Sequence, residues 1–331
     1  MNPFGLNPVR WGVIGAGDIV RRRVAPALID SPACDIVAVS RGRPELAAAF
    51  AADIGARRWY SHWQEVVADP DVDCVYVATP VDVHAEQTIA AAEAGKHVLC
   101  EKPMAMTTAE CDRMIAACRA HHVRLGIAYY RHFYPAILRV KALLESGDIG
   151  QPVFAQVNAF EYFDPAPDNP RRWLLDPARA GGGPMMDFGC HRLEVLMHLF
   201  GAVRRTAAIT ANVVFDRPVE DTAAVLLQFE GGPCAAVTVT HAAEERQDTL
   251  QVFGTRGSVH IDELNAGQLR IRTGNQSRVE SHPPADNIHR PLIDDFVEAL
   301  LTDREPAVTG EIGRAVAAIE DEIYAVAPSG R

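Results

Sequence analysis

The sequence contains no long apolar run and no excess of positive charge. None of its hydrophobic stretches approaches the roughly 20 residues that a membrane-spanning helix needs. Its 43 acidic residues outnumber its 32 lysines and arginines, and the formal net charge of −11 argues against a nucleic-acid or anionic-membrane partner. Residues 1–5 lack the basic and apolar segments of a secretory signal. We therefore expect a cytoplasmic protein.

The cysteines are scattered along the chain and show no pattern. The seven cysteines are odd in number, and no two of them lie at the CxxC spacing of a zinc site. Most stand in apolar runs, where a cysteine behaves as a small buried hydrophobe. Reduced thiols fit the cytoplasm, and we expect no metal site.

The first 125 residues alternate short apolar runs with alanine-rich stretches. The runs are typical of buried strands and the stretches predict helices, so the alternation predicts a parallel, doubly wound sheet. Thr107 or Thr108 is expected to cap one helix, Gly95 to end the helix before it, and Pro26 to kink or shorten the first. The predicted strands cover residues 9–14, 36–40, 72–78, 98–100 and 124–128, and the clearest helices cover 44–54, 83–94 and 108–121.

A glycine turn follows the first predicted strand. Gly15-Ala16-Gly17 stands between that strand and the first helix, where a dinucleotide pyrophosphate binds in such a sheet. The third position of the G-x-G-x-x-G/A pattern is Val20, which implies a wider approach of the helix to the strand. An ordinary glycine-rich turn is the alternative. We assign four residues to the cofactor site: Gly15, Gly17, Asp18 and Ile19.

The residues after the second predicted strand bear on the choice of cofactor. NAD-binding folds carry an acidic residue there that binds the adenosine ribose. Here the strand ends in Ser40-Arg41-Gly42-Arg43, which contains no carboxylate. Ser40 can donate to a phosphate oxygen and Arg41 can pair with a 2′-phosphate, although Arg41 and Arg43 could also be solvated loop cations. We expect a preference for NADP(H), with NAD(H) as the alternative cofactor.

Among the first 125 residues, Lys102 is the strongest candidate for a role in a reaction. It lies in Glu101-Lys102-Pro103, at the end of the apolar run 98–100. Ligands of open α/β sheets bind at the carboxyl ends of the strands, so this ammonium is expected at the ligand edge. Together with the glycine turn it predicts a nicotinamide-dependent oxidoreductase, with a Rossmann dinucleotide-binding domain over residues 1–125.

After residue 125 the pattern becomes α+β. Helices are predicted at residues 135–146, 186–200, 291–302 and 310–326. Seven strand-like runs predict a large, mostly antiparallel, open sheet. They cover residues 153–160, 206–215, 222–230, 234–242, 249–253, 258–262 and 268–272. We expect residues 126–331 to form an α+β domain that binds the substrate and forms the oligomer.

One face of this sheet is expected to pack against another subunit. The two faces of residues 153–160 and the face of Cys234, Ala236, Thr238 and Thr240 carry almost no charge. An open antiparallel sheet that faces water on one side should alternate with polar residues. A weakly charged face of this kind predicts a homodimer or homotetramer.

A glycine-rich segment carries two candidate catalytic residues. Asp187 and His191 follow Gly181-Gly182-Gly183 and are four residues apart, so that on a helix they would share a face. A carboxylate can hold an imidazole in one tautomer and raise its basicity, as a general base near neutral pH requires. The glycines would let the backbone approach a ligand. A helix-capping Asp and a satisfied surface His are the alternative.

Four segments together resemble the glucose–fructose oxidoreductase, inositol dehydrogenase and rhizopine-catabolism family, abbreviated Gfo/Idh/MocA. They are Gly15-Ala16-Gly17, Ala78-Thr79-Pro80 with His84, residues 94–103 and residues 181–199, and the resemblance covers nearly the whole chain. It implies that three residues are catalytic: Lys102, Asp187 and His191. It implies cofactor contacts by Thr79, Pro80, His84, Glu101, Lys102 and Trp173. Glu194 departs from the family, which often has Asp three residues after the histidine.

The resemblance implies a dehydrogenase or reductase for a secondary alcohol or ketone of a sugar, cyclitol or related diol. Lys102 would hydrogen-bond the reacting oxygen, and either Lys102 or His191 would transfer the proton. A glycosidase that uses transient oxidation and a non-catalytic dinucleotide-sensing regulator are the alternatives, although the presence of all three catalytic residues argues against the regulator. Residues 129–132 and His289 are weaker candidates, which could face substrate, pack in the protein or, for His289, stand in a solvated loop.

Overall fold

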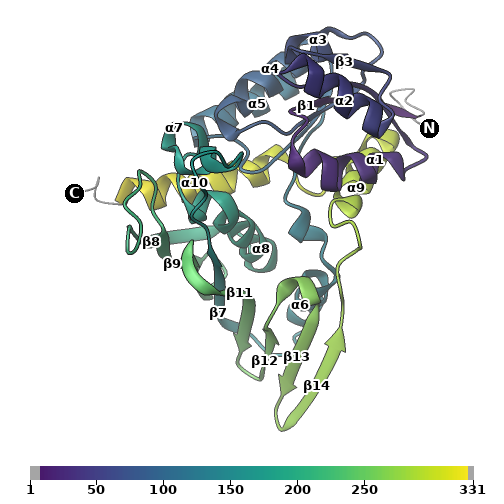
Figure 1. Ribbon diagram of the computed structural model, residues 1–331. Helices are drawn as coiled ribbons and strands as arrows, with labels where there is room; N and C mark the ends of the chain where they lie inside the picture. The colour runs from purple at the N-terminus through teal and green to yellow at the C-terminus, as the bar shows by residue number, and fades with distance from the viewer. Residues whose placement is uncertain (1–7, 327–331) are drawn as a thin grey trace. The chain divides into compact units, whose positions relative to one another are not determined.

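The computed structural model describes residues 8–326, and its contacts divide them into two compact units. One unit comprises the described chain up to Tyr130 together with Ala285–Ala315. The other comprises Arg131–Pro284 together with the described chain from Val316. Each unit is built on one sheet, and Figure 1 shows strands of both, most clearly those of the second unit.

The first unit contains the predicted Rossmann-type sheet of six parallel strands. The strand order is β3-β2-β1-β4-β5-β6, so the direction of winding reverses between β1 and β4, where such sheets bind their ligands. The strands β4 and β5 are buried over their whole length, as expected for a sheet covered on both faces. The six are β1 (Val9–Ile14), β2 (Cys34–Ser40), β3 (Arg58–Tyr60), β4 (Cys74–Val77), β5 (His97–Cys100) and β6 (Leu125–Ile127).

The helices between these strands agree with the predicted ones, apart from short additions. The Thr107 side chain accepts a 3.2 Å hydrogen bond from the Glu110 amide and caps α5, and Gly95 has a φ of +73° after α4. Two short elements, β3 and α3, were not predicted from the sequence. The helices are α2 (Pro44–Ile54), α3 (Trp63–Ala68), η2 (Val81–Val83), α4 (His84–Glu93) and α5 (Thr108–Ala120).

The first helix starts with a wide π-helical turn, η1 (Val20–Val24), and continues as the short α1 (Ala25–Ile29). Pro26 has no amide hydrogen to donate to the preceding turn, and the π-helical turn ends just before it. Val20 is fully buried. The helix therefore accommodates a side chain where the glycine pattern normally leaves space, and the predicted short or kinked helix is confirmed.

The chain returns to the first unit with α9 (Arg290–Thr302). Phe296 of α9 and Trp11 of β1 are buried, and their ring centroids lie 6.0 Å apart. Gly126 of β6 lies so close to Phe296 that an added Cβ would come within 2.7 Å of the ring. The units therefore differ from the two consecutive segments 1–125 and 126–331, because the apolar face of α9 packs on the first sheet.

The second unit contains the predicted large, open sheet. Its order is β14-β13-β12-β11-β7-β10-β9-β8, with β7 and β10 parallel and the other neighbours antiparallel. The strand β14 consists almost entirely of polar residues and was not predicted from the sequence. The strands are β7 (Pro152–Tyr162), β8 (Val203–Ala211), β9 (Thr222–Phe229), β10 (Cys234–Thr240), β11 (Ala242–Gly254), β12 (Gly257–Ile261), β13 (Gln268–Thr273) and β14 (Gln276–Ser281).

Helices cover one face of this sheet, where Ala155, Val157, Val237 and Val239 are buried and where η5 and α8 pack against β10. Within residues 8–326, no helix combines the length and the apolar composition needed to cross a bilayer. The helices are η3 (Tyr130–Phe133), α6 (Pro135–Glu145), η4 (Arg172–Leu175), α7 (Pro177–Ala180), η5 (Met185–Gly189), α8 (Cys190–Phe200), η6 (Leu264–Ala266) and α10 (Gly310–Val326), of which α10 supplies residues to both units.

The strand β8 ends at Ala211, four residues before the predicted end. The amides of Val213, Val214 and Phe215 donate to the carboxylate of Asp221 at 2.8–3.0 Å. These amides are therefore turned away from the ladder of the sheet. The Asp221 carboxylate therefore ends β8 by binding the amides that follow it. The apolar run in the sequence continues past this point and does not reveal the end.

A buried ion triad joins β11 to α8 and η3. Asp248 receives Arg192 Nη2 at 2.6 Å and Arg131 Nη2 at 2.9 Å, and the three side chains are only 7–11% exposed. Burial acts to raise the pKa of Asp248, but the two guanidinium groups hold that pKa below its usual range. The triad fixes the first turn of α8, which also contains His191.

Asp248→Asn is expected to lower the free energy of unfolding by about 3 kcal/mol, because two buried guanidinium groups lose their counter-charge. The wild-type advantage should be complete above the pKa of an unfolded Asp, about 4, and should be lost as the pH falls through the lower folded pKa. Urea unfolding of both proteins at neutral and acidic pH measures this difference in the free energy of unfolding. The control Asp262→Asn, at a side chain 70% exposed beside Arg270, should leave the midpoint unchanged. Equal stability of D248N and the wild type at neutral pH would contradict the role of the triad.

Candidate active site

The glycine turn after β1 fits a dinucleotide. Gly15 has a φ of +89°, and an added Cβ would lie 2.7 Å from the Ala78 carbonyl, so only glycine is accommodated. An added Cβ at Gly17 would meet nothing closer than 3.8 Å, which leaves open space beside the backbone. Asp18 and Ile19 are exposed at the start of the helix. A tight turn, open space and a helix start are what the pyrophosphate needs.

The residues after β2 lie beside this turn. The Ser40 carbonyl accepts hydrogen bonds from the amides of Gly15 and Ala16 at 3.3 and 3.2 Å. Ser40 is buried, Arg41 is partly exposed, and the Arg41 amide donates to the Tyr60 carbonyl at 3.2 Å. The side chain of Arg41 therefore starts from a fixed backbone position next to the glycine turn.

His84 connects the turns that follow β4 and β5. Its Nε2 lies 2.8 Å from the Thr79 carbonyl and its Nδ1 lies 3.0 Å from the Pro103 carbonyl. The Thr79 hydroxyl donates to Gln87 Oε1 at 2.7 Å, and Pro80 directly precedes η2. His84 is 1% exposed. Both of its ring nitrogens contact backbone, so it holds the turns after β4 and β5 in place.

Glu101 forms a buried polar cluster next to Lys102. Tyr76 donates to Glu101 Oε1 at 2.8 Å, and the Lys102 amide donates to Oε2 at 3.2 Å. Burial acts to raise the pKa of Glu101, but His289 and the Lys102 charge keep that pKa below its usual range. The peptide bond between Lys102 and Pro103 is cis. Lys102 is thus anchored at the carboxyl end of β5, as the sequence predicted.

His289 is buried, and its interpretation as a solvated loop residue is wrong. It is 1% exposed, its Nε2 lies 3.5 Å from Glu101 Oε1, and its ring centroid lies 4.8 Å from that of Tyr130. Tyr129 is fully buried and Arg131 belongs to the ion triad. The contacts of His289 with Glu101 and Tyr130 place it in the Glu101 cluster.

Two of the three glycines before Asp187 have a structural role that the sequence does not reveal. An added Cβ at Gly183 would overlap the Glu220 carbonyl, and one at Gly182 would overlap the Tyr324 hydroxyl. The Glu220 carboxylate accepts from the amides of Gly183 and Met185 at 2.7 and 3.2 Å, and from the Tyr324 hydroxyl at 2.9 Å. We expected the backbone at these glycines to approach a ligand. At Gly182 and Gly183 it instead approaches other residues of the protein.

Asp187 lies in the π-helical turn η5, and its side chain is 17% exposed. Its Oδ2 lies 3.6 Å from Arg171 Nη2 and 3.9 Å from Nε2 of the fully buried His241. Glu161 of β7 is the second carboxylate in this group, 3.8 Å from the same Nε2. Neither His241 nor Glu161 was predicted from the sequence, because their place beside Asp187 depends on the pairing of distant strands.

His191 and Trp173 belong to the same unit as Asp187. His191 is buried in the first turn of α8, so its interpretation as a surface histidine is wrong. Trp173 is partly buried and packs against the apolar cluster of Phe163, Leu174 and Ala180. The predicted contact of Trp173 with the cofactor stays a prediction.

Two groups of metal-type ligands occur in the described part of the chain: Glu161, Asp187 and His241, and His132, Glu194 and His198. In each group a cation faces one imidazole. Arg217 Nη2 lies 3.1 Å from His241 Nδ1, and Lys141 Nζ lies 3.5 Å from His198 Nδ1. An imidazole nitrogen that accepts a hydrogen bond from a cation leaves the ring proton on the other nitrogen. Neither His241 nor His198 therefore offers a free nitrogen lone pair to a metal. The expectation that the chain holds no metal stays a prediction, and this hydrogen bonding supports it.

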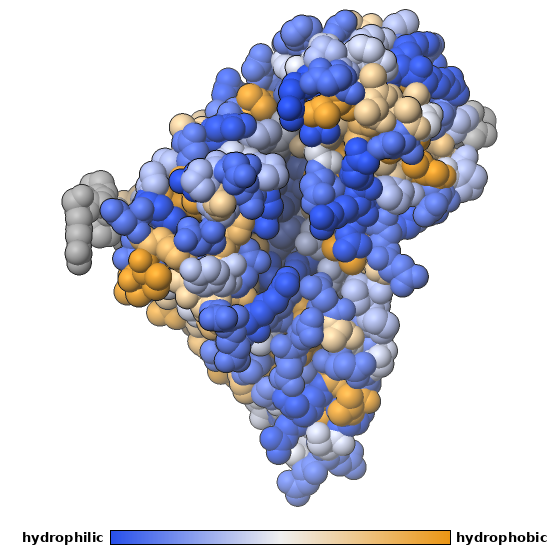
Figure 2. Space-filling model, viewed as in Figure 1, coloured by the Kyte–Doolittle hydropathy of each residue, from blue (hydrophilic) through white to orange (hydrophobic). Residues whose placement is uncertain are grey.

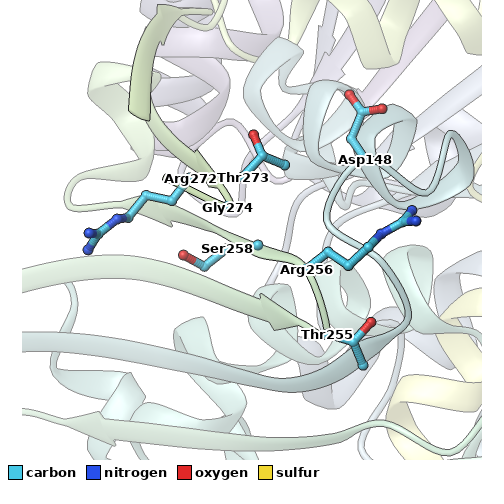
Figure 3. Close-up of a pocket in the computed structure, with 8 residues that line it drawn as sticks. Asp148, Thr255, Arg256, Ser258, Arg272, Thr273 and Gly274 are labelled. Atoms are coloured by element: carbon cyan, nitrogen blue, oxygen red, sulfur yellow. The ribbon is translucent and has the colours of Figure 1, made fainter. Parts of the chain in front are cut away.

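A shallow pocket of about 730 Å³ lies at the turns around β12 and β13. It is lined by polar side chains that do not converge, since Figure 3 shows Arg256 and Arg272 pointing in opposite directions. Arg256 also donates to the Gly147 carbonyl. The pocket contains none of the predicted site residues, so it is not the candidate active site.

Comparison with known protein families matches both parts of the chain. Residues 9–129 match the model described as "Oxidoreductase family, NAD-binding Rossmann fold". Residues 137–260 match the model described as "GFO/IDH/MocA C-terminal domain". The two matches together cover well over half of the chain.

Individual relatives are oxidoreductases of sugars. The chain is 32% identical to a 1,5-anhydro-D-fructose reductase of Ensifer adhaerens, over 92% of each chain. It is 31% identical to an NADP(+)-dependent D-xylose 1-dehydrogenase of Haloarcula marismortui, over 93% of this chain and 88% of the relative. The structure resembles the aldose–aldose oxidoreductase of Caulobacter crescentus complexed with glycerol, with a TM-score of 0.89, 29% identity, and coverage of 98% and 99%. The chain therefore belongs to the Gfo/Idh/MocA family and is an NAD(P)-dependent oxidoreductase that acts on CH–OH groups.

Proposed function

We propose that the protein is an NADP(H)-preferring enzyme that interconverts a secondary alcohol and a ketone of a sugar, cyclitol or related diol. The observation that carries the proposal is Lys102, anchored by the buried Glu101 carboxylate at the carboxyl end of β5. The names of the sugar oxidoreductases among its relatives support the substrate class. The free cysteines of the described chain are consistent with a place in the cytoplasm.

Three residues carry the proton and charge chemistry in this proposal. The dinucleotide, when bound along the glycine turn, supplies the hydride acceptor or donor. Lys102 donates a hydrogen bond to the reacting oxygen and stabilises the charge that develops on it. His191 accepts the hydroxyl proton in the direction of oxidation. Asp187 orients His191 or the substrate, and the family resemblance supports all three roles.

Lys102→Met is expected to lower turnover at least about a hundredfold, because one charged donor at a reacting oxygen supplies roughly 3 kcal/mol. Dinucleotide affinity, measured by fluorescence titration, should stay within several-fold of the wild type. The assay is nicotinamide absorbance with a panel of polyols, sugars and dihydrodiols. Lys141→Met, on α6, is the control and should retain activity. Near-normal turnover of K102M would remove Lys102 from the chemistry.

Arg41→Ala is expected to abolish most of the preference for NADP(H). Arg41 follows a strand end that carries no carboxylate, and a charged hydrogen bond to the 2′-phosphate corresponds to roughly ten- to a hundredfold in affinity. The ratio of kcat/KM for the two cofactors, at fixed substrate and ionic strength, measures the preference. Arg43→Ala, two residues along and exposed, is the matched control. A clear NAD preference in the wild type would show that Arg41 does not read the phosphate.

We also propose a homodimer or homotetramer built on the open face of the second sheet. Ile209 and Leu226 are 72% and 60% exposed there, beside Ala236 and Thr238 of β10. Figure 2 shows hydrophobic surface over the β8–β9 end of this unit. Light scattering should give at least twice the 36.0 kDa of one chain at micromolar concentration. Leu226→Lys should shift the protein toward the monomer, and a monomeric wild type would refute the interface.

A glycosidase that works by transient oxidation is the rival enzyme. It would release product from a glycoside without net cofactor turnover, whereas the proposed enzyme changes nicotinamide absorbance in proportion to product. The same panel of substrates, extended by aryl glycosides, therefore separates the two. A regulator that only senses the dinucleotide would bind it and turn over nothing.

A further inference from the structure

His241 occupies a fixed, fully buried position between β10 and β11. Its amide donates to the Asp221 carbonyl at 2.8 Å, and its carbonyl accepts from the Phe163 amide at 2.9 Å. The imidazole packs against two rings, with its centroid 4.9 Å from that of Phe163 and 5.2 Å from that of Phe188. Both backbone and ring are therefore held, and the direction of each ring nitrogen is defined.

Arg217 determines which nitrogen of His241 carries the proton. Arg217 Nη2 lies 3.1 Å from Nδ1, and a guanidinium can only donate. Arg217 is itself held by the carbonyls of Phe163 and Glu220 at 3.0 and 3.2 Å. Burial lowers the pKa of His241 to about 4, so the ring is neutral near pH 7. The single ring proton is consequently on Nε2.

The Nε2–H of His241 faces two carboxylates. Glu161 Oε1 lies 3.8 Å away and Asp187 Oδ2 lies 3.9 Å away, and among the described residues Nε2 has no hydrogen-bond partner. A buried donor without a partner is costly, whereas a donor aimed at two nearby carboxylates needs only a small movement to pair. Catalytic hydrogen bonds are often long before substrate binds and shorten in the complex.

The two carboxylates form a coupled pair. Burial and the Asp187 charge raise the pKa of Glu161, so the two groups titrate as a unit. Cations surround the pair without neutralising it fully, since the Arg171 side chain beside Asp187 is 53% exposed. The other charged groups that act on Glu161 or His241 are Arg192, Arg246, Arg217 and Asp221.

We propose that His241 is a positioning residue of the reaction, whose Nε2–H points at the Asp187–Glu161 pair and holds Asp187 ionised and oriented. The inference rests on the proposed role of Asp187. A neutral donor stabilises the negative charge without adding a competing ion. No metal is needed for this arrangement.

Two substitutions of His241 separate the donor from the packing. His241→Phe keeps a ring between Phe163 and Phe188 but removes the N–H, whereas His241→Gln loses the ring and keeps an amide donor near the position of Nε2. In H241F the acidic limb of the kcat/KM profile should move up by about 0.5–1 pH unit, because Asp187 loses a donor to its charged form. In H241Q the limb should stay in place.

Glu161→Gln supplies a test of opposite sign that does not depend on the folding of a buried variant. Removing the neighbouring carboxylate should lower the pKa of Asp187, so the acidic limb should move to lower pH. An upward shift in E161Q, an unchanged limb in H241F, or equal shifts in H241F and H241Q would each overturn the proposal.

A second readout separates this inference from the proposed function. Carboxylate carbon NMR of the protein without substrate follows the titration of the pair directly, with E161Q and D187N used to assign the signals. The same directions of shift are expected there. Absence of turnover in the wild type would contradict the proposed function, while the NMR titration would still decide whether His241 acts on the pair.

Discussion

The helix that carries Asp187 and His191 depends on one buried carboxylate. Glu220 accepts the amides of Gly183 and Met185 and the hydroxyl of Tyr324, so it satisfies donors that the start of a helix leaves open. The contact is so close that an added Cβ at Gly183 would overlap Glu220. Burial raises the pKa of this carboxyl group, although these hydrogen bonds act to lower it. Both candidate catalytic residues of the second unit take their positions from this contact.

The first unit uses the same principle around Lys102. The Glu101 carboxylate is buried and is held by Tyr76, by His289 and by the backbone of Lys102 itself. Each unit thus has a buried carboxylate that accepts hydrogen bonds from several donors. This carboxylate fixes a short segment of backbone that carries the candidate catalytic side chains. Positions held in this way do not have to be rebuilt when the substrate binds, which is the condition for stabilising charge on a reacting oxygen. The Asp248 triad adds a third such carboxylate, beside the residue that follows His191.

Local patterns in the sequence were sufficient for most of the fold. The bounds of β1, α2 and α10 were predicted to the residue, because an apolar run or a helical period with clear ends marks each of them. The three residues of β3 and the polar β14 carry no such pattern, and β8 is cut short by a side chain ten residues beyond its end. Among the candidate site residues, the glycine turn and Lys102 were predicted just after two strands, and the structure places them after β1 and β5. His241 and Glu161 lie 54 and 26 residues from Asp187 along the chain, and only the pairing of β7, β10 and β11 brings them together.

The return of α9 to the first unit has a consequence for the order in which the protein can fold during synthesis. The face of the first sheet that Phe296 covers is complete by residue 127, yet its cover is translated about 165 residues later. Until then Trp11 and the close-packed surface at Gly126 lack their partner in the nascent chain. The whole second sheet is made in this interval, so the amino-terminal unit must wait for almost the entire polypeptide before its own core can close.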